Sequence, residues 1–341
     1  MNAQLPTGHS AVPSRKTGIL LLNLGTPDAT DYWSVRRYLE EFLSDPRVIE
    51  TPRLIWWPLL NGVILSVRPQ KAGANYAKIW DREENDSPLR VITRRQAEKL
   101  QAAFAGRDDV LVDYGMRYGN PSIKSAIERL HEAGCDRILL FPLYPQYSAT
   151  TTGTANDQAF RALMKIRWQP AVRTVPAYFE DPGYVEVLAR SITEGLAKLD
   201  FTPDLVITSY HGMPRSYIER GDPYYDQCHE TTRLVGEHLG WEQDRLMVTF
   251  QSRFGPTEWL QPYTDETLES LPGKGIKKVA ILAPAFSVDC IETLEEIEME
   301  GRDLFMAAGG ENYAYIPCLN DTPDGMKIIE TIARRELSGW L

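Results

Sequence analysis

Short apolar runs alternate with longer amphipathic segments along the whole chain. Seven runs rich in leucine and β-branched residues predict strands, at residues 18–24, 110–114, 137–142, 173–177, 205–210, 246–251 and 278–284. Between them, apolar positions recur at helical spacing, as in 122–133 and 184–199. Near-continuous apolar strands separated by helices are typical of a parallel sheet with helices on both faces. The pattern therefore predicts a doubly wound, Rossmann-like α/β fold.

Three short motifs recur in the same order in the two halves of the chain. Each follows a predicted strand: LGTP and HGMP at 24–27 and 211–214, MRYG and SRFG at 116–119 and 252–255, FPLY and APAF at 141–144 and 283–286. We therefore expect two similar α/β domains, at residues 17–180 and 181–341, after a loose N-terminal tail at 1–16. The first two motifs are about 51 residues further apart in the first half, which indicates an insertion within about 30–90. Such an insertion lies at the carboxyl edge of the sheet, where ligands bind.

The insertion contains the most apolar stretch of the chain, at residues 54–67, between Arg53 and Arg68. This stretch is shorter than the ~20 residues of a transmembrane helix, and Pro58 and Asn61 interrupt it. Two interpretations stay open: a buried helix, or an exposed lip that contacts an apolar ligand or a membrane surface. The place of the insertion in the fold favours the lip, and with it a peripheral membrane contact.

Composition narrows the class of protein. The chain has 341 residues, of which 43% are hydrophobic and 25% charged, as in ordinary globular proteins. Its net charge of −10 argues against a nucleic-acid partner, so an anionic ligand requires a local cluster of basic side chains. The four cysteines form no C-x-x-C pair and the N-terminal residues no apolar signal segment, which favours a reducing, cytoplasmic location.

One histidine lies where a doubly wound sheet binds its ligand. His211 directly follows the predicted strand at 205–210, and the matching position in the first half is Leu24. The carboxyl ends of the strands in such sheets open into the ligand crevice. Gly212 and Pro214 indicate a tight turn after the imidazole. This position is equally consistent with a structural histidine and with a catalytic or metal-binding one.

A row of carboxylates follows the last predicted strand. Glu292, Glu296 and Glu300 recur every four residues and share one face of a helix. Because an apolar stripe lies on the other side, a merely solvated face is the ordinary interpretation. If Glu292 shares a crevice with His211, the pair suits a borderline divalent cation or the removal of a proton. Two such ligands do not make a closed structural metal site.

Two further groups follow strands of the first half. Tyr144 and Tyr147 offer flat apolar faces, and Ser148 begins a series of hydroxyls that either bind anionic groups or cap a helix. Arg117 and Tyr118 follow the neighbouring strand, where the guanidinium is suited to a carboxylate. The sequence contains no G-x-G-x-x-G, P-loop or G-x-S-x-G motif, so a nucleotide cofactor or a serine nucleophile is not supported.

Together these motifs resemble those of the ferrochelatases, which insert Fe²⁺ into a porphyrin at the end of haem synthesis. The resemblance covers residues 17–320 in the family's order and rests on GILLLNLGTP (18–27), GMRY (115–118), LYPQYS (143–148) with TTG (151–153), SYHGMP (209–214), GDPY (221–224), FQSRFGP (250–256) and residues 286–296. It implies a lyase-class enzyme with two chelatase-type domains around a porphyrin cleft. The substrates it implies are protoporphyrin IX and Fe²⁺, which give protohaem and two protons.

The resemblance also implies roles for individual residues. His211 and Glu292 become the paired catalytic and metal-site residues, and Glu296 and Glu300 extend them as a path for metal or protons. The helix that carries these carboxylates is expected to contain a π-bulge, a feature frequent at functional sites. Five residues are expected to contact the porphyrin: Arg117, Tyr118, Tyr144, Ser148 and Trp259.

The sequence departs from parts of the family in its cysteines. Some members hold a [2Fe–2S] cluster through three C-terminal cysteines and one near the Tyr-Ser motif. Here the tail has only Cys318, and position 149 is alanine. A cluster requires four thiolates, so we expect no cluster and no prosthetic group. Some members have histidine at the position of Cys290, whose role is therefore not transferred.

Two alternative functions stay open. A cobalt chelatase for a sirohydrochlorin-type ring would act on a substrate with more carboxylates, which requires a more basic mouth than the apolar stretch around Trp56 and Trp57. A non-catalytic haem or porphyrin carrier needs a strong axial ligand but no acidic row. The choice between protoporphyrin and coproporphyrin, the order of proton removal and metal insertion, and the oligomeric state do not follow from the sequence.

Overall fold

The computed structural model describes residues 15–341 except Pro256. Most of the expected N-terminal tail, residues 1–14, therefore lies outside the described residues, and the first strand begins at Lys16. The first half contains, in chain order, β1 (Lys16–Thr26), α1 (Tyr32–Leu43), α2 (Arg53–Leu59), the π-helical turn η1 (Leu60–Ile64), α3 (Leu65–Ile79), α4 (Pro88–Ala103), β2 (Val110–Gly119), α5 (Ile123–Glu132), β3 (Cys135–Pro142), the π-helical turn η2 (Ala149–Gly153), α6 (Thr154–Leu163) and β4 (Ala171–Thr174).

The second half repeats the alternation of strands and helices. It contains α7 (Pro182–Ala197), β5 (Leu205–His211), α8 (Arg215–Glu219), α9 (Tyr224–Leu239), the 3₁₀ turn η3 (Gln243–Arg245), β6 (Leu246–Gln251), α10 (Thr264–Ser270), the 3₁₀ turn η4 (Pro272–Lys274), β7 (Lys278–Leu282), the π-helix η5 (Glu292–Gly301), α11 (Arg302–Ala307), β8 (Asn312–Tyr315) and α12 (Pro323–Glu336).

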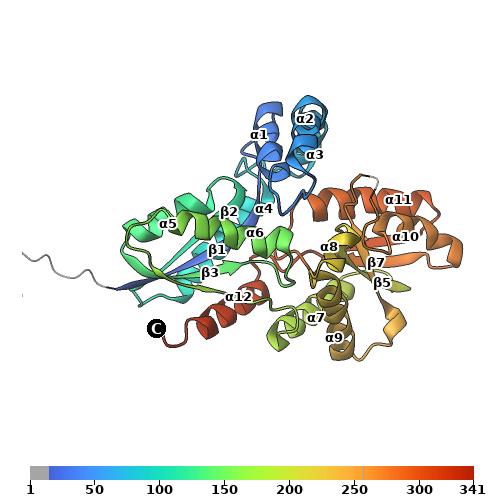
Figure 1. Ribbon diagram of the computed structural model, residues 1–341. Helices are drawn as coiled ribbons and strands as arrows, with labels where there is room; N and C mark the ends of the chain where they lie inside the picture. Colours follow the sequence, from blue (N-terminus) through green and yellow to red (C-terminus); the bar gives the residue numbers. More distant parts are fainter. Residues whose placement is uncertain (1–14, 256) are drawn as a thin grey trace, which may run out of the picture.

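The strands form two four-stranded parallel sheets of the same topology. The strand order is β2-β1-β3-β4 in the first sheet and β6-β5-β7-β8 in the second. The first strand of each half pairs with the second strand on one side and the third on the other, as in the register pairs Leu20–Asp113 and Leu20–Leu140. Figure 1 shows the two sheets in separate lobes, each flanked by helices. The predicted α/β fold with two similar halves is confirmed.

The apolar run of β1 explains why this sheet is covered on both faces. Side chains alternate between the faces of a strand. Leu20 and Leu22 accordingly pack in the cluster that includes α5 and α6, while Ile19 and Leu21 pack in a second cluster. All four are fully buried. The second cluster also takes in side chains of the other sheet, so apolar packing joins the two halves.

Three details of the strands differ from the sequence prediction. β2 continues to Gly119, five residues beyond its expected end, so Arg117 and Tyr118 lie within the strand instead of after it. β4 begins at Ala171, two residues before the expected position, and β8 was not predicted. β8 is short and reads Asn-Tyr-Ala-Tyr, which lacks the long apolar run on which the other strands were recognised. The last helix, α12, packs against α4 and β3 as well as α7. Its Arg334 donates to the carbonyl of Ala103 at 2.6 Å.

The insertion between β1 and β2 forms a separate layer of helices. Helices α1, α2 and α3 rise above the two lobes in Figure 1, while α4 lies against the first sheet. Trp56 anchors the insertion, because its ring is buried and its Nε1 donates to the carbonyl of Leu43 at 2.7 Å. The neighbouring Trp57 is 44% exposed. In the described part of the chain, no helix is both long and apolar enough to cross a membrane.

Candidate functional site

His211 is the last residue of β5, and its tautomer follows from one hydrogen bond. Its Nδ1 lies 2.6 Å from the carbonyl oxygen of Gly212. A carbonyl oxygen can only accept, so Nδ1 carries the proton and the neutral ring keeps a lone pair on Nε2. The imidazole is partly exposed at the carboxyl edge of the second sheet. It is therefore oriented as a proton acceptor or a metal ligand.

The expected π-bulge is confirmed, and it is longer than a single turn. The π-helix η5 runs through ten residues, from Glu292 to Gly301. Its N-terminal end is held by Asp289, whose carboxylate accepts from the Thr293 hydroxyl at 3.0 Å and from the Asn320 amide at 2.6 Å. Because π-helical hydrogen bonds join residues five apart, this segment does not have the simple α-helical spacing assumed for its carboxylates.

Glu296 connects His211 with Glu292 electrostatically. Burial raises the pKa of the Glu296 carboxyl, the charge of Glu292 raises it further, and hydrogen bonds from Ser252 together with His211 oppose the rise. The main-chain N–H of Ser252 donates to Glu296 at 2.7 Å, and the Ser252 hydroxyl donates to the same carboxylate. Gln251 links the three residues, because it pairs with His211 in the sheet while its side-chain amide donates to the carbonyl of Glu292 at 2.8 Å and to the Glu296 carboxylate at 3.4 Å.

Glu300 lies apart from these three residues, on the outer part of η5. It is exposed and neighbours Glu295, which is five residues away, as π-helical geometry favours. Partial burial and the Glu295 charge raise the pKa of Glu300, whereas Lys78 and Lys71 lower it. Buried Glu295 pairs with Lys78 of α3 at 2.6 Å. Through Glu295, the ion pair with Lys78 therefore joins η5 to the insertion.

Tyrosines cover the crevice next to Glu292. Burial raises the pKa of Tyr76, from the insertion, and the nearby Glu292 charge raises it further. Burial likewise raises the pKa of Tyr144. The charge of Arg117 lowers this pKa, whereas Cys290 and Glu292 raise it. The Tyr144 hydroxyl is buried and has no hydrogen-bond partner among the described residues.

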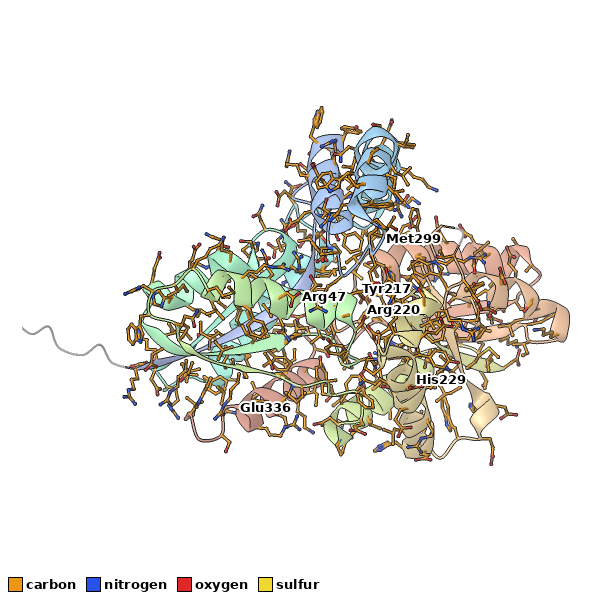
Figure 2. All side chains as sticks on the ribbon, viewed as in Figure 1. Arg47, Tyr217, Arg220, His229, Met299 and Glu336 are labelled. Carbon is orange, nitrogen blue, oxygen red and sulfur yellow. The ribbon has the colours of Figure 1, made fainter. Side chains whose placement is uncertain are left out.

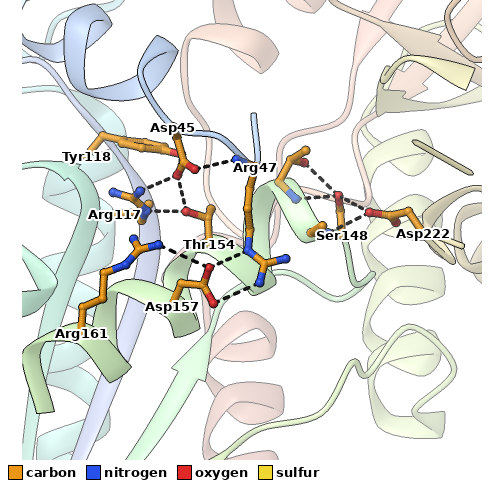
Figure 3. Close-up of polar contacts among 11 residues, drawn as sticks. Asp45, Arg47, Arg117, Tyr118, Ser148, Thr154, Asp157, Arg161 and Asp222 are labelled. Atoms are coloured by element: carbon orange, nitrogen blue, oxygen red, sulfur yellow. Dashed lines mark hydrogen bonds and ion pairs between the residues drawn. The ribbon is translucent and has the colours of Figure 1, made fainter. Parts of the chain in front are cut away.

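Arg117 and Tyr118 lie in a buried polar network instead of at an open mouth (Figure 3). The Arg117 guanidinium pairs with Asp45 and donates to the Thr154 hydroxyl at 2.6 Å. The Tyr118 hydroxyl donates to Asp45 at 2.8 Å. We expected the guanidinium to bind a substrate carboxylate, but the structure gives it a protein carboxylate as its partner.

Ser148 is occupied in a similar way. Its hydroxyl accepts from the N–H of Thr150, which caps η2, and it donates to Asp222 of the second half at 3.1 Å. Figure 3 shows the contact with Asp222, which joins the two halves. Trp259 lies against the turn after His211, because a Cβ placed on Gly212 would be 3.2 Å from its ring. Its Nε1 is buried and unpartnered among the described residues.

The structure also identifies residues that the sequence analysis missed. These are Asp45, Gln251, Ser252 and Glu295, and all of them contact or support a predicted site residue. Asp45 comes from an irregular segment with no motif of its own, and Glu295 falls outside the four-residue spacing. In residues 15–255 and 257–341, no three His, Cys, Asp or Glu side chains are grouped to hold one metal ion. His211 and Glu292 therefore stay a predicted pair of metal ligands.

Known proteins resemble this chain over almost its full length. The family model described as Ferrochelatase matches residues 16–337. A ferrochelatase of Chelativorans sp. (strain BNC1) is 60% identical, over 99% of this chain and 96% of the relative. A ferrochelatase of Rhizobium meliloti (strain 1021) is 58% identical, over 98% of this chain and 99% of the relative.

Among solved structures, SirB from Bacillus subtilis with Fe³⁺ aligns with a TM-score of 0.57. The alignment covers 95% of this chain and 97% of SirB, at 12% sequence identity. At this identity the likeness concerns the fold alone.

Proposed function

The chain belongs to the ferrochelatase family, and we propose on this basis that it inserts Fe²⁺ into protoporphyrin IX. The products are protohaem and two protons, and the reaction is the last step of haem synthesis. The observation that supports the site is that Gln251, which pairs with His211 in the second sheet, hydrogen-bonds to the carbonyl of Glu292 and to the carboxylate of Glu296. Fe²⁺ is a substrate here, and imidazole with carboxylate suits a borderline divalent ion.

The reaction makes three demands on the protein: it must distort the flat macrocycle, strip water from Fe²⁺ and remove two pyrrole protons. We assign the distortion to the apolar insertion, which uses binding energy from the periphery of the ring. We assign proton removal to Nε2 of His211, because the Gly212 carbonyl keeps the proton on Nδ1. Glu292 acts as its partner, and Glu296 and Glu300 lead metal or protons to and from the site.

The porphyrin contacts are assigned to residues with unused polar atoms or open faces. Tyr144 and Trp259 each have a buried, unpartnered donor near the crevice, which supports a direct contact. Asp45 and Asp222 hold Arg117, Tyr118 and Ser148 in place, and we propose that these three residues contact the porphyrin from these positions.

We propose that the insertion also makes a peripheral contact with a membrane on the cytoplasmic side. Six apolar side chains of this segment are exposed: Leu54, Ile55, Trp57, Leu59, Val63 and Val67. Arg53 stacks over the ring of Trp57, so a cation flanks the apolar surface. Apolar and aromatic residues beside arginine are typical of segments that lie in the headgroup region.

We further propose that the enzyme works without a resident iron–sulfur cluster. A [2Fe–2S] cluster requires four thiolates close together. Cys135, Cys228 and Cys290 lie in three different apolar clusters. Burial raises the pKa of Cys135 to about 11, which keeps this thiol protonated at neutral pH.

The function is tested by incubating the purified protein with Fe²⁺ and protoporphyrin IX under reducing, anaerobic conditions. We expect the porphyrin fluorescence to be lost and a protohaem spectrum to appear over many turnovers. Parallel reactions contain coproporphyrin with Fe²⁺ and sirohydrochlorin with Co²⁺. A porphyrin carrier would change the spectrum once, in proportion to the protein, and a cobalt chelatase would turn over only the sirohydrochlorin. Either outcome would overturn the proposal.

A further inference from the structure

Gln251 connects the strand that ends in His211 with the first residue of the π-helix. It is the last residue of β6, and its side chain is 3% exposed. In the second sheet it pairs with His211, and its carbonyl accepts from the N–H of Gly212 at 2.7 Å. Its side-chain Nε2 donates to the carbonyl of Glu292 at 2.8 Å. One residue therefore contacts the backbone on both sides of the crevice.

A hydroxyl of the same sheet fixes the orientation of this carboxamide. Ser209, two residues before His211, donates to Oε1 of Gln251 at 2.8 Å. Because the oxygen faces Ser209, the nitrogen has to face Glu292. Behind Ser209, the hydroxyls of Thr264 and Thr249 continue a buried chain at 2.9 and 2.8 Å. The amide is thus held at both ends.

The next residue extends the same arrangement to Glu296. Ser252 has φ +65°, in the left-handed region that residues with a side chain rarely adopt. In this conformation its N–H and its hydroxyl both point to the Glu296 carboxylate. Unusual backbone conformations of this kind are concentrated at functional sites, where the surrounding contacts maintain them.

We propose that Gln251 is a positioning residue, which fixes the separation between the His211 imidazole and Glu292. Ser209 acts through it by orienting its amide. The proposal rests on the proposed function insofar as His211 and Glu292 act on the same metal and porphyrin. The Gln251 side chain ends on protein groups, the Glu292 carbonyl and, at 3.4 Å, the Glu296 carboxylate, so its loss should change the rate of insertion and leave porphyrin binding unchanged.

Gln251→Met tests this, because methionine keeps the length of the side chain and removes both polar ends. We expect kcat to fall by about 10- to 100-fold, as small misplacements of catalytic groups do. The KM for porphyrin and its dissociation constant, measured by fluorescence, should stay within about twofold. Gln101→Met is the matched control. Gln101 also bridges backbone groups, at Val110 and Val112, but on the far side of the first sheet.

A second variant keeps the test independent of folding. Ser209→Ala removes only the hydroxyl that orients the amide, and its effect on kcat should be smaller. In the double variant the two effects should not add, since both act through one contact. Equal kcat for wild type, Gln251→Met and Ser209→Ala would overturn the proposal. So would losses of kcat that are matched by Gln101→Met.

The proposed function and the positioning role fail in different ways. A wild-type protein that inserts no Fe²⁺ contradicts the function. In that case, titration with Co²⁺ alone, followed by its visible absorption, still measures how well the imidazole and the carboxylate bind one cation together. The positioning role predicts that Gln251→Met weakens Co²⁺ binding about tenfold and that Gln101→Met does not. Unchanged Co²⁺ binding in Gln251→Met would contradict it.

Discussion

Asp45 determines what Arg117 can do in this protein. Its carboxylate accepts from Arg117, Tyr118 and Thr154, so one buried acid satisfies three donors from the first domain. The position of Arg117 at the end of β2 was predictable from the strand pattern. Its partner was not, because Asp45 precedes it by 72 residues and lies in an irregular segment. An arginine predicted at a strand end therefore indicates where the guanidinium lies. It does not indicate whether a protein carboxylate already neutralises its charge.

The Asp45 network predicts how stability depends on pH. Burial alone would raise the pKa of Asp45, but hydrogen bonds from Thr154 and the Arg47 main chain, with Arg117, hold it below its ordinary value of 3.8. A lowered pKa stabilises the folded state above the ordinary value, and this stabilisation is lost as the pH falls through the folded-state pKa. Asp45→Asn should cost about 3 kcal/mol at pH 7 because it removes the nearer counter-charge of buried Arg117 and leaves only the more exposed Glu41, at 3.8 Å.

Urea unfolding between pH 7 and pH 3 measures this effect. The difference between wild type and Asp45→Asn should shrink once the pH falls below about 4. The control is Asp113→Asn, which breaks the more exposed ion pair with Arg129 and should cost at most about 1 kcal/mol. A difference that stays constant down to pH 3 would contradict the assignment of the charge.

At the scale of elements, the π-helix explains why the acidic row was only partly predictable. The four-residue spacing predicted a row of Glu292, Glu296 and Glu300, but the segment is π-helical from Glu292 to Gly301. This spacing missed that the side chains of Glu295 and Glu300 are neighbours. Residues five apart lie on the same face only where the backbone hydrogen bonds of the helix are π-helical. The sequence alone does not indicate whether residues Glu292–Gly301 are more stable as an α-helix or as a π-helix. Here η5 is anchored at Asp289 and joined to α3 of the insertion by Lys78 and Glu295.

The link between Lys78 and Glu295 predicts an asymmetry between two variants. Glu295 is buried, whereas the Lys78 side chain is 47% exposed. Lys78→Met leaves a buried carboxylate without its cation, while Glu295→Gln leaves only a solvated ammonium. We expect Lys78→Met to lower Tm by on the order of 3 °C and Glu295→Gln to lower it less. Scanning calorimetry measures the Tm of both variants. An equal decrease in Tm would contradict the predicted asymmetry between Lys78→Met and Glu295→Gln.

At the scale of the whole molecule, the turn after His211 is tied to the base of the insertion. The Tyr217 hydroxyl donates to the carbonyl of Val48 at 3.0 Å, and Arg220 pairs with Glu50. Figure 2 shows Tyr217, Arg220 and Arg47 together at the junction of the two lobes. The two-fold repetition of the sheets was predictable from the recurring motifs. These contacts were not, because they join the short helix α8 and its C-terminal end to an irregular segment about 170 residues earlier in the chain.

The exposed face of the insertion predicts binding to lipid vesicles. The wild-type protein should float with anionic phospholipid vesicles in a density gradient. Leu54→Ser combined with Val67→Ser should weaken this binding by at least about tenfold, since each change removes an exposed apolar side chain. Met164→Ser removes a comparably exposed side chain just after α6 and serves as the control. Equal flotation of all three proteins would exclude a membrane contact through this face.

The role of His211 is tested most directly by the rate of Fe²⁺ insertion into protoporphyrin IX in His211→Ala. His238→Ala, which changes an exposed histidine of α9, is measured beside it. We predict that His211→Ala loses insertion by at least about 100-fold and still binds the porphyrin with wild-type affinity, while His238→Ala behaves as wild type. Insertion by His211→Ala at a rate close to that of the wild type would contradict the proposed site.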